Sequence, residues 1–136
     1  MSKDAKILIV DDKPENLFAL EHLIDEMNLG CSVMKAQSGQ QALKQIQQDE
    51  FALVLLDIMM PGMDGYEVAK HIRETHQKDV LPIIFITAHT GPKPLDKFMA
   101  AGAVGSLEKP IDPEVLKRKL SLFLSIYKQR QKKQAA

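Results

Sequence analysis

Acidic, hydroxyl and ammonium side chains stand at the ends of four strand-like runs in this sequence. They are Asp11, Asp12, Asp57, Thr87 and Lys109. Runs rich in valine, leucine and isoleucine, without polar alternation, are typical of central parallel strands that are covered on both faces. Because ligands of such sheets bind outside the carboxyl ends of the strands, the pattern predicts one site formed by these residues.

Three carboxylates at one edge of a sheet repel one another unless something compensates their charge. Two like charges about 4 Å apart repel by roughly 4 kcal/mol at an effective dielectric constant near 20, a large fraction of a small domain's stability. A hard divalent cation relieves this repulsion, and Mg²⁺ suits a site with few carboxylates, retained waters and a phosphate ligand. Zinc is disfavoured, because Cys31 and the histidines show no ligand spacing. Each residue alone also fits a plain strand end or helix cap, so the prediction depends on the combination.

The elements that must position these residues alternate regularly along the chain. A helical pattern follows each of five strand patterns, which cover residues 6–10, 31–36, 51–57, 82–87 and 104–109. Such alternation predicts right-handed βαβ units and an α/β fold with a doubly wound parallel sheet. The fourth helix is the weakest, because prolines delay its start to Leu95 and Gly102 ends it early. We expect this short helix to be a mobile element.

The composition restricts the class of protein. The chain has 136 residues, 45% of them hydrophobic, and 18 basic residues balance 18 acidic ones. These values predict one globular domain with a real core, and zero net charge disfavours direct binding to nucleic acid or to an anionic membrane. A single cysteine excludes an internal disulfide. The sequence shows neither a signal-peptide pattern nor an apolar run of about 20 residues, so we expect a cytoplasmic protein.

Four segments of the sequence together resemble the motif set of the receiver domain of two-component response regulators. They are residues 7–12 (ILIVDD), 56–65 (LDIMMPGMDG), 86–88 (ITA) and 107–110 (LEKP). They occur in the family's order, and the resemblance covers residues 5–127. It implies a flavodoxin-like fold with five parallel strands in the order 2-1-3-4-5 and helices on both faces. It also implies a cytoplasmic phosphoprotein of a phosphorelay that carries 4-aspartylphosphate and uses Mg²⁺.

The resemblance implies a phosphoacceptor and a metal site among the acidic residues. Asp57 is implied to be the phosphoacceptor and, together with Asp12 and the backbone carbonyl oxygen of Met59, to bind Mg²⁺. Asp11 is implied to act mainly through a metal-bound water. A carboxylate attacks an anionic phosphoryl group poorly unless charge is neutralised, so these roles agree with the chemistry of the residues.

The remaining motif residues are implied to bind the phosphoryl group. The Thr87 hydroxyl and the backbone N–H of Ala88 are implied to hydrogen-bond it, and Lys109 to pair with another of its oxygens. The peptide bond Lys109–Pro110 is implied to be cis. Phosphorylation adds about 1.5 to 2 negative charges, which can pull Thr87 inward and repack what lies beyond it. We therefore expect a two-state switch.

The expected function is that of a phosphoacceptor receiver. A histidine kinase or a histidine phosphotransfer protein supplies the phosphoryl group from a phosphohistidine, and the phosphorylated domain controls an output domain or a partner protein. The domain promotes its own phosphorylation and dephosphorylation without turnover of an independent substrate, so we do not expect an enzyme.

Two alternative functions remain open from the sequence. One is a small Mg²⁺-dependent phosphatase with Asp57 as nucleophile, although Met59 stands where such an enzyme carries an acid–base aspartate and no cap insertion is visible. The other is a pseudo-receiver that only binds partners, although all the acidic, hydroxyl and ammonium residues of the motifs are present.

Three positions bear on how the expected signal is transmitted and how long it lasts. The family usually has an aromatic residue three positions before the conserved lysine, and this sequence has Ser106 there. Signal transmission is therefore expected to use the helix at residues 95–101 or another packing change. Met59 and His89 stand where the family controls access of hydrolytic water, and we expect an intermediate to slow loss of the phosphoryl group.

The last predicted helix, from Pro113 to about Arg130, carries more apolar surface than one sheet can cover. Its apolar residues span about 200° of the helical projection, whereas a core-facing stripe needs little over 100°. We therefore expect a homodimer or contact with a further domain through residues 113–130, against the plainer alternative that a few apolar residues are simply exposed. We expect a receiver domain over residues 1–127, followed by a polar helical extension or linker at residues 128–136.

Overall fold

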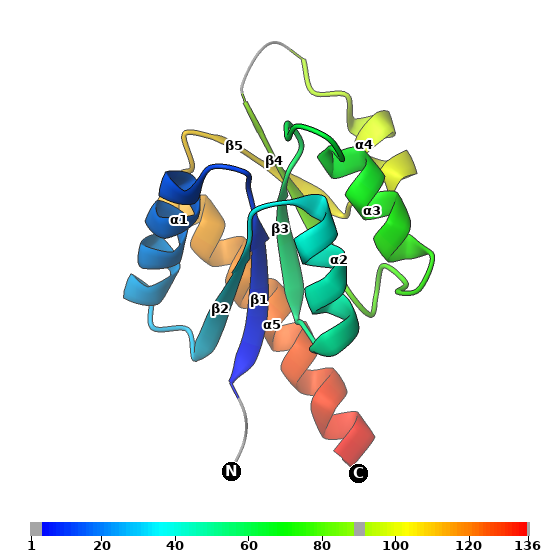
Figure 1. Ribbon diagram of the computed structural model, residues 1–136. Coiled ribbons are helices and arrows are strands. Elements are labelled where there is room, and N and C mark those ends of the chain that lie inside the picture. The colour runs from blue at the N-terminus through cyan, green and yellow to red at the C-terminus, as the bar shows by residue number, and fades with distance from the viewer. Residues whose placement is uncertain (1–3, 89–91, 136) are drawn as a thin grey trace.

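The computed structural model describes residues 4–88 and 92–135. Five strands alternate with five helices in this part of the chain (Figure 1). In chain order the elements are β1 (Ala5–Val10), α1 (Pro14–Glu26), β2 (Cys31–Ala36), α2 (Gly39–Gln48), β3 (Leu53–Asp57), α3 (Gly65–Arg73), β4 (Ile83–Ala88), α4 (Leu95–Ala101), β5 (Gly105–Lys109) and α5 (Pro113–Ala135). The alternation confirms the βαβ organisation that the sequence predicts.

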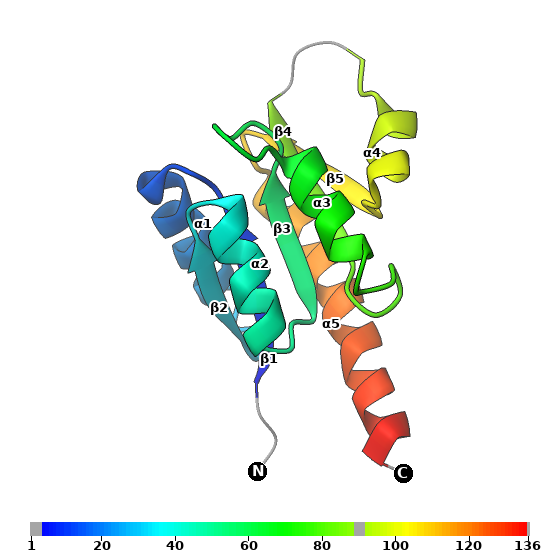
Figure 2. The same ribbon diagram turned by 45° about the vertical axis from the view of Figure 1, so that its right-hand side comes forward.

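The strands form one parallel sheet in the order β2-β1-β3-β4-β5, which confirms the predicted fold class. Helices α1 and α5 cover one face of the sheet, and α2, α3 and α4 cover the other (Figure 1 and Figure 2). β1 and β3 are neighbours, paired from Ile7 with Leu53 to Val10 with Leu56. Their carboxyl ends therefore stop side by side at the same edge.

β3 is buried along its whole length, which explains its unbroken apolar sequence. Leu53 and Leu55 pack in the core beneath α1 and α5, whereas Val54 and Leu56 pack in the core beneath the other three helices. Full burial of one such side chain stabilises the fold by about 1.5–3 kcal/mol. Since side chains alternate along a strand, Asp57 faces the same side as Leu55. The strand therefore presents Asp57 at the edge of a rigid core.

Helices α3 and α4 begin very differently. Asp64 caps α3 by accepting a hydrogen bond from the Glu67 backbone N–H at 3.0 Å, and the Glu67 carboxylate accepts one from the Asp64 N–H at 3.4 Å. α4 is preceded by Pro94, and no side chain among the described residues caps it. The loss of a side-chain cap typically costs about 1 kcal/mol. The bounds of α4 match the weak helix that the sequence predicts, and Gly102 ends it at a φ of 105°.

α5 continues past Arg130 to Ala135, through the segment for which the sequence left a helical extension or a linker open. Its lower part extends beyond the sheet (Figure 1). Leu122 and Ile126 are 55% and 44% exposed, so the sheet leaves part of the apolar surface uncovered. The side chains that α5 buries are Leu116, Leu120 and Leu124. In the described part of the chain, no helix combines the length and the apolar character needed to span a bilayer.

Candidate functional site

Asp11, Asp12 and Asp57 come together where β1 and β3 end. Each contributes one carboxylate oxygen to a cluster whose atoms lie within 4.8 Å of one another. The cause is the sheet register: Val10 pairs with Leu56, so the next residue of each strand reaches the same edge. Asp11 and Asp57 are buried, and Asp12 is half-buried. The structure thus brings the three acidic residues of the sequence analysis into one place.

The carboxylate of Asp57 contacts both a lysine ammonium and a backbone N–H. Lys109 Nζ is 3.2 Å from Asp57 Oδ2 and 3.7 Å from Asp11 Oδ2. The Met59 backbone N–H donates to Asp57 Oδ1 at 3.1 Å. Burial raises the pKa of Asp57 above its ordinary value, and the two donors oppose this shift while the charge of Asp11 adds to it. Such a raised pKa at a strand end is typical of functional carboxylates.

Asn16 belongs to the site and was missed by the sequence reasoning. Its side-chain amide donates to Asp11 Oδ2 at 3.1 Å, while the Lys13 backbone N–H donates to Asp11 Oδ1 at 2.9 Å. These two hydrogen bonds fix the Asp11 carboxylate at the start of α1. The available signal was the position of Asn16 in the first turn of that helix, from which a short amide side chain can reach back to the strand end.

Thr87 and Ala88 end the neighbouring strand β4. Asp57 pairs with Ile86, so Thr87 lies one residue beyond the level of Asp57. The Thr87 side chain is half-buried, and its hydroxyl donates to the Ala88 carbonyl oxygen at 3.2 Å. By strand alternation this side chain faces α3 and α4, on the side opposite to Asp57. Thr87 therefore lies at the same edge of the sheet as the acidic cluster, with its hydroxyl turned along its own strand.

The loop after Asp57 closes tightly against the strand end. The Gly65 N–H donates to the Ile58 carbonyl oxygen at 2.8 Å. A Cβ at position 65 would lie 2.6 Å from the Asp57 carbonyl oxygen, so only glycine fits there. The Met59 side chain within this loop is 75% exposed, while its backbone N–H contacts Asp57. Gly65 thus lets α3 begin directly beside the acidic cluster.

The donor atoms of the cluster suit a hard divalent cation. All of them are carboxylate oxygens, and the Lys109 ammonium pairs with two of the three carboxylates, those of Asp11 and Asp57. Mg²⁺ prefers oxygen ligands and needs few carboxylates, and a second positive partner would offset the cost of burying these acids. Asp11, Asp12 and Asp57 can therefore hold a metal ion of the predicted class.

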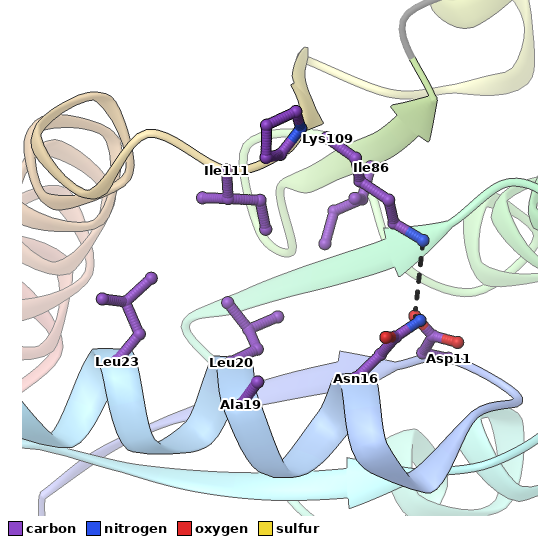
Figure 3. Close-up of a pocket in the computed structure, with 9 residues that line it drawn as sticks. Asp11, Asn16, Ala19, Leu20, Leu23, Ile86, Lys109 and Ile111 are labelled. Carbon is purple, nitrogen blue, oxygen red and sulfur yellow. Dashed lines mark hydrogen bonds and ion pairs between the residues drawn. The ribbon is translucent and has the colours of Figure 1, made fainter.

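An open apolar groove of about 360 Å³ leads to the cluster (Figure 3). Its walls come from α1 and from the segment between β5 and α5, and include Leu20, Leu23 and Ile111. Asp11 and Lys109 lie at one end of the groove, where a dashed line in Figure 3 joins them. Apolar walls beside a few charged groups are typical of sites that bind a ligand or a partner side chain.

Ser106 is half-buried on β5 and pairs with Phe85 of β4. His89 lies outside the described residues. The Lys109–Pro110 peptide bond is cis, as the resemblance implies.

Known proteins share this sequence pattern. The profile of the response regulator receiver domain matches residues 7–121. The chain is 31% identical to protein PilH of Pseudomonas aeruginosa over 123 residues, which are 89% of this chain and 98% of PilH. It is 36% identical to the sensor protein GacS of Pseudomonas syringae pv. syringae over 119 residues, which are 85% of this chain but only 13% of GacS. The chain thus spans a small part of some relatives and nearly all of others.

A solved structure shares the fold. Chemotaxis protein CheY4 of Vibrio cholerae matches with a TM-score of 0.79 at 33% sequence identity, over 88% of this chain and 98% of CheY4. The order of the strands, the acidic cluster and the profile match over residues 7–121 all indicate the same family. The chain therefore belongs to the response regulator receiver domain family of two-component signalling systems.

Proposed function

We propose that this domain accepts a phosphoryl group on Asp57 from the phosphohistidine of a partner histidine kinase or histidine phosphotransfer protein, and that the modification controls an output domain or a partner protein. The observation that carries the proposal is the position of Asp57. It is a buried carboxylate at a strand end, 3.2 Å from Lys109 and within the acidic cluster. Receiver domains are signalling modules, and this arrangement fits a phosphoacceptor.

Asp57 is the nucleophile of the proposed transfer. One of its carboxylate oxygens forms a bond to phosphorus while the P–N bond of the phosphohistidine breaks, and the bonding electron pair stays on the imidazole nitrogen. Lys109 offsets the negative charge of the transferring group, since its ammonium already lies beside Asp57. The product is an acyl phosphate on Asp57, and hydrolysis returns the free carboxylate.

Mg²⁺ is the proposed cofactor of this transfer. Asp12, Asp57 and the backbone carbonyl oxygen of Met59 would hold it directly, and Asp11 would act in its outer sphere. When bound, the cation supplies charge neutralisation at the phosphoryl oxygens. The support is the set of carboxylate oxygens within 4.8 Å of one another, of which those of Asp11 and Asp57 face the Lys109 ammonium.

Thr87 and Ala88 are proposed to bind the transferred phosphoryl group. The Thr87 hydroxyl donates to the Ala88 carbonyl oxygen, and a charged phosphoryl oxygen is the stronger acceptor. Rotation of that hydroxyl towards phosphorylated Asp57, together with a hydrogen bond from the Ala88 N–H, changes the end of β4. This local change is the proposed first step of the switch.

The apolar groove of Figure 3 is proposed as the contact area for the phosphodonor protein. A histidine can reach Asp57 only if its protein docks beside the acidic cluster, and the groove ends at Asp11 and Lys109. We further propose that the domain, over residues 1–127, turns over no independent substrate, binds no nucleic acid and acts in the cytoplasm. We also propose an intermediate to slow loss of the phosphoryl group, supported by the position of Met59 two residues after Asp57 in the family motif.

A homodimer through the helix at residues 113–130 is a further part of the proposal. Its support is the exposure of Leu122 and Ile126 on α5. Contact with an output domain through the same residues is the competing arrangement. Light scattering with and without a phosphoryl mimic separates the two, because a strictly monomeric protein under both conditions contradicts the homodimer.

Incubation with acetyl phosphate and Mg²⁺, followed by intact mass measurement, tests the phosphoacceptor. We expect the parent protein to gain one phosphoryl group and Asp57→Asn to gain none. Asp79→Asn is the matched control, because it neutralises an exposed aspartate outside the cluster and should behave like the parent. An equal gain by the parent and by Asp57→Asn, or no gain by the parent, would overturn the assignment.

A further inference from the structure

Ser106 stands beside a large aromatic side chain of the neighbouring strand. It pairs with Phe85 of β4, so the two side chains are neighbours on the same face of the sheet. Phe85 is fully buried, whereas Ser106 is half-buried. The aromatic volume that the family usually places on β5 therefore lies one strand further into the sheet.

Phe85 belongs to a cluster of three aromatic rings from three elements. Its ring centroid lies 5.4 Å from that of Tyr66 in α3 and 5.3 Å from that of Phe98 in α4, both in edge-to-face arrangements. The centroids of Tyr66 and Phe98 are 6.2 Å apart. Lys97 of α4 places its Nζ 4.4 Å from the centroid of the Tyr66 ring. The energy of such contacts depends on ring orientation, so a displacement of Phe85 acts on both helices.

α4 is attached differently at its two ends. At its carboxyl end, the Gly102 carbonyl oxygen accepts a hydrogen bond from Arg73 Nε at 2.9 Å, and Arg73 donates to two further carbonyl oxygens of the loop that precedes β4. At its amino-terminal end, no described side chain caps the helix. Phe98 is the large side chain that α4 buries. Lys93, two residues before the helix, pairs with Glu108 of β5, but both side chains are partly exposed, so this contact is weak. The helix is therefore fixed mainly at Gly102 and by burial of Phe98.

Thr87 is positioned to act on this cluster. It follows Phe85 by two residues on β4, so both side chains face α3 and α4. A change at Thr87 therefore occurs two residues from Phe85, on the same strand and the same face of the sheet. Because interiors are close-packed, the displaced ring cannot move without its neighbours.

We propose that the cluster of Tyr66, Phe85 and Phe98 couples the phosphorylation site to α4, in place of an aromatic residue at position 106. The inference rests on the proposed function, since its input is the movement of Thr87 towards a phosphoryl group on Asp57. The shift of β4 displaces the Phe85 ring, Phe98 follows, and α4 reorients about its fixed end at Gly102. Repacking between two discrete arrangements is a known form of such switching.

Hydrogen exchange of the α4 amides, with and without acetyl phosphate and Mg²⁺, tests the coupling on the intact chain. In the parent, exchange over residues 95–102 is expected to change by about fivefold or more on phosphorylation. Tyr66→Leu and Phe98→Leu should reduce this change to about twofold or less. Tyr66→Phe keeps the ring and should retain the parent's change. Phe51→Leu removes a ring that is as buried as that of Phe98 but lies outside the cluster, and it is the matched control.

Measurements on the same samples distinguish failure of the coupling from failure of the proposed function. Thermal unfolding shows that each variant is folded, and Tyr66→Leu, at a half-buried position, is the milder of the two leucine variants. A phosphoryl mass gain with unchanged α4 exchange in the parent, or with the parent's change in both leucine variants, overturns the coupling and leaves the proposed function intact. Loss of the change in Ser106→Ala overturns it as well, because position 106 then transmits the signal. No mass gain in the parent overturns the proposed function and the coupling with it.

Discussion

Asp57 ends β3, and α4 follows the neighbouring strand β4, but the structure holds these two features in different ways. Asp57 ends a strand that is buried along its length, and it contacts Lys109 and the Met59 N–H. α4 has seven residues, begins without a side-chain cap among the described residues, and leaves Leu95 and Met99 more than half exposed. Asp57 is thus held firmly, while α4 is weakly attached. Elements that move in a switch come from the low-stability end of a structure, and α4 meets this condition.

The largest expected contrast is in the free energy of unfolding. Leu55 of β3 is fully buried, whereas Leu95 of α4 is exposed. Leu55→Ala leaves a cavity in the core, so we expect a loss of about 2–5 kcal/mol. Leu95→Ala should change the value by no more than about 0.5 kcal/mol. Urea unfolding of both variants gives the two numbers, and equal losses would remove the contrast between the regions.

Lys109 should matter for phosphorylation more than any lysine outside the site. Lys109→Met keeps an unbranched side chain but removes the ammonium that lies 3.2 Å from Asp57. We expect the rate of phosphorylation by acetyl phosphate to fall about 100-fold or more, as for other single electrostatic contacts to a transition state. Lys117→Met makes the same chemical change at an exposed position of α5 and should leave the rate unchanged. A parental rate in Lys109→Met would mean that charge neutralisation comes from elsewhere.

Asp57 is expected to reduce stability at neutral pH even though it is rigidly placed. Its pKa in the folded protein is raised above 3.8, chiefly by burial, so the folded state binds the proton more tightly than the unfolded chain. The stability from this group is complete below pH 3.8 and is lost as the pH rises through the raised pKa. In metal-free buffer, Asp57→Asn should therefore be more stable than the parent at neutral pH, with an advantage that fades in acid. Thermal unfolding across this range checks the sign, and a less stable variant at neutral pH would show that the contacts with Lys109 and Met59 outweigh burial.

The smallest expected effect concerns the end of α5. The Tyr127 hydroxyl donates to Glu50 at 3.0 Å, and burial with this contact raises the pKa of Tyr127 from 10.0 to about 12. The corresponding stability is present below pH 10.0 and is lost as the pH rises towards about 12. Tyr127→Phe should cost about 0.5–1.5 kcal/mol at neutral pH and remove this alkaline dependence. Urea unfolding at neutral and alkaline pH measures both, and an unchanged alkaline loss in the variant would assign it to other groups.

The strands and the acidic cluster could be predicted from the sequence because both follow from local patterns. An unbroken apolar run before Asp57 requires burial on both faces, and parallel strands end at a common edge. The end of α5 was left open between a helical extension and a linker, because a polar segment has no apolar periodicity that decides between them. Residues 128–135 are mostly polar and contain no glycine or proline that would stop the helix, and the contact of Tyr127 with Glu50 is a tertiary interaction.

The sequence could not predict which side chains from distant elements contact one another. Tyr66, Phe85 and Phe98 come from three elements, and only the packing of α3 and α4 on β4 brings their rings together. The direction of the Thr87 hydroxyl is a choice among rotamers, which a residue pattern does not determine. Asn16 had a positional signal, but its partner Asp11 became evident only from the geometry.

The distance along the chain between Lys109 and Asp57 has a consequence for biosynthesis. The two residues are 52 positions apart, and they meet only when β5 has paired with β4 beyond β3. During translation the three aspartates are made well before their ammonium partner, and parallel pairings over such separations form slowly. A nascent or truncated chain therefore carries the acids without the group that offsets their charge. The contact that offsets the charge of Asp57 therefore forms only when the sheet is complete.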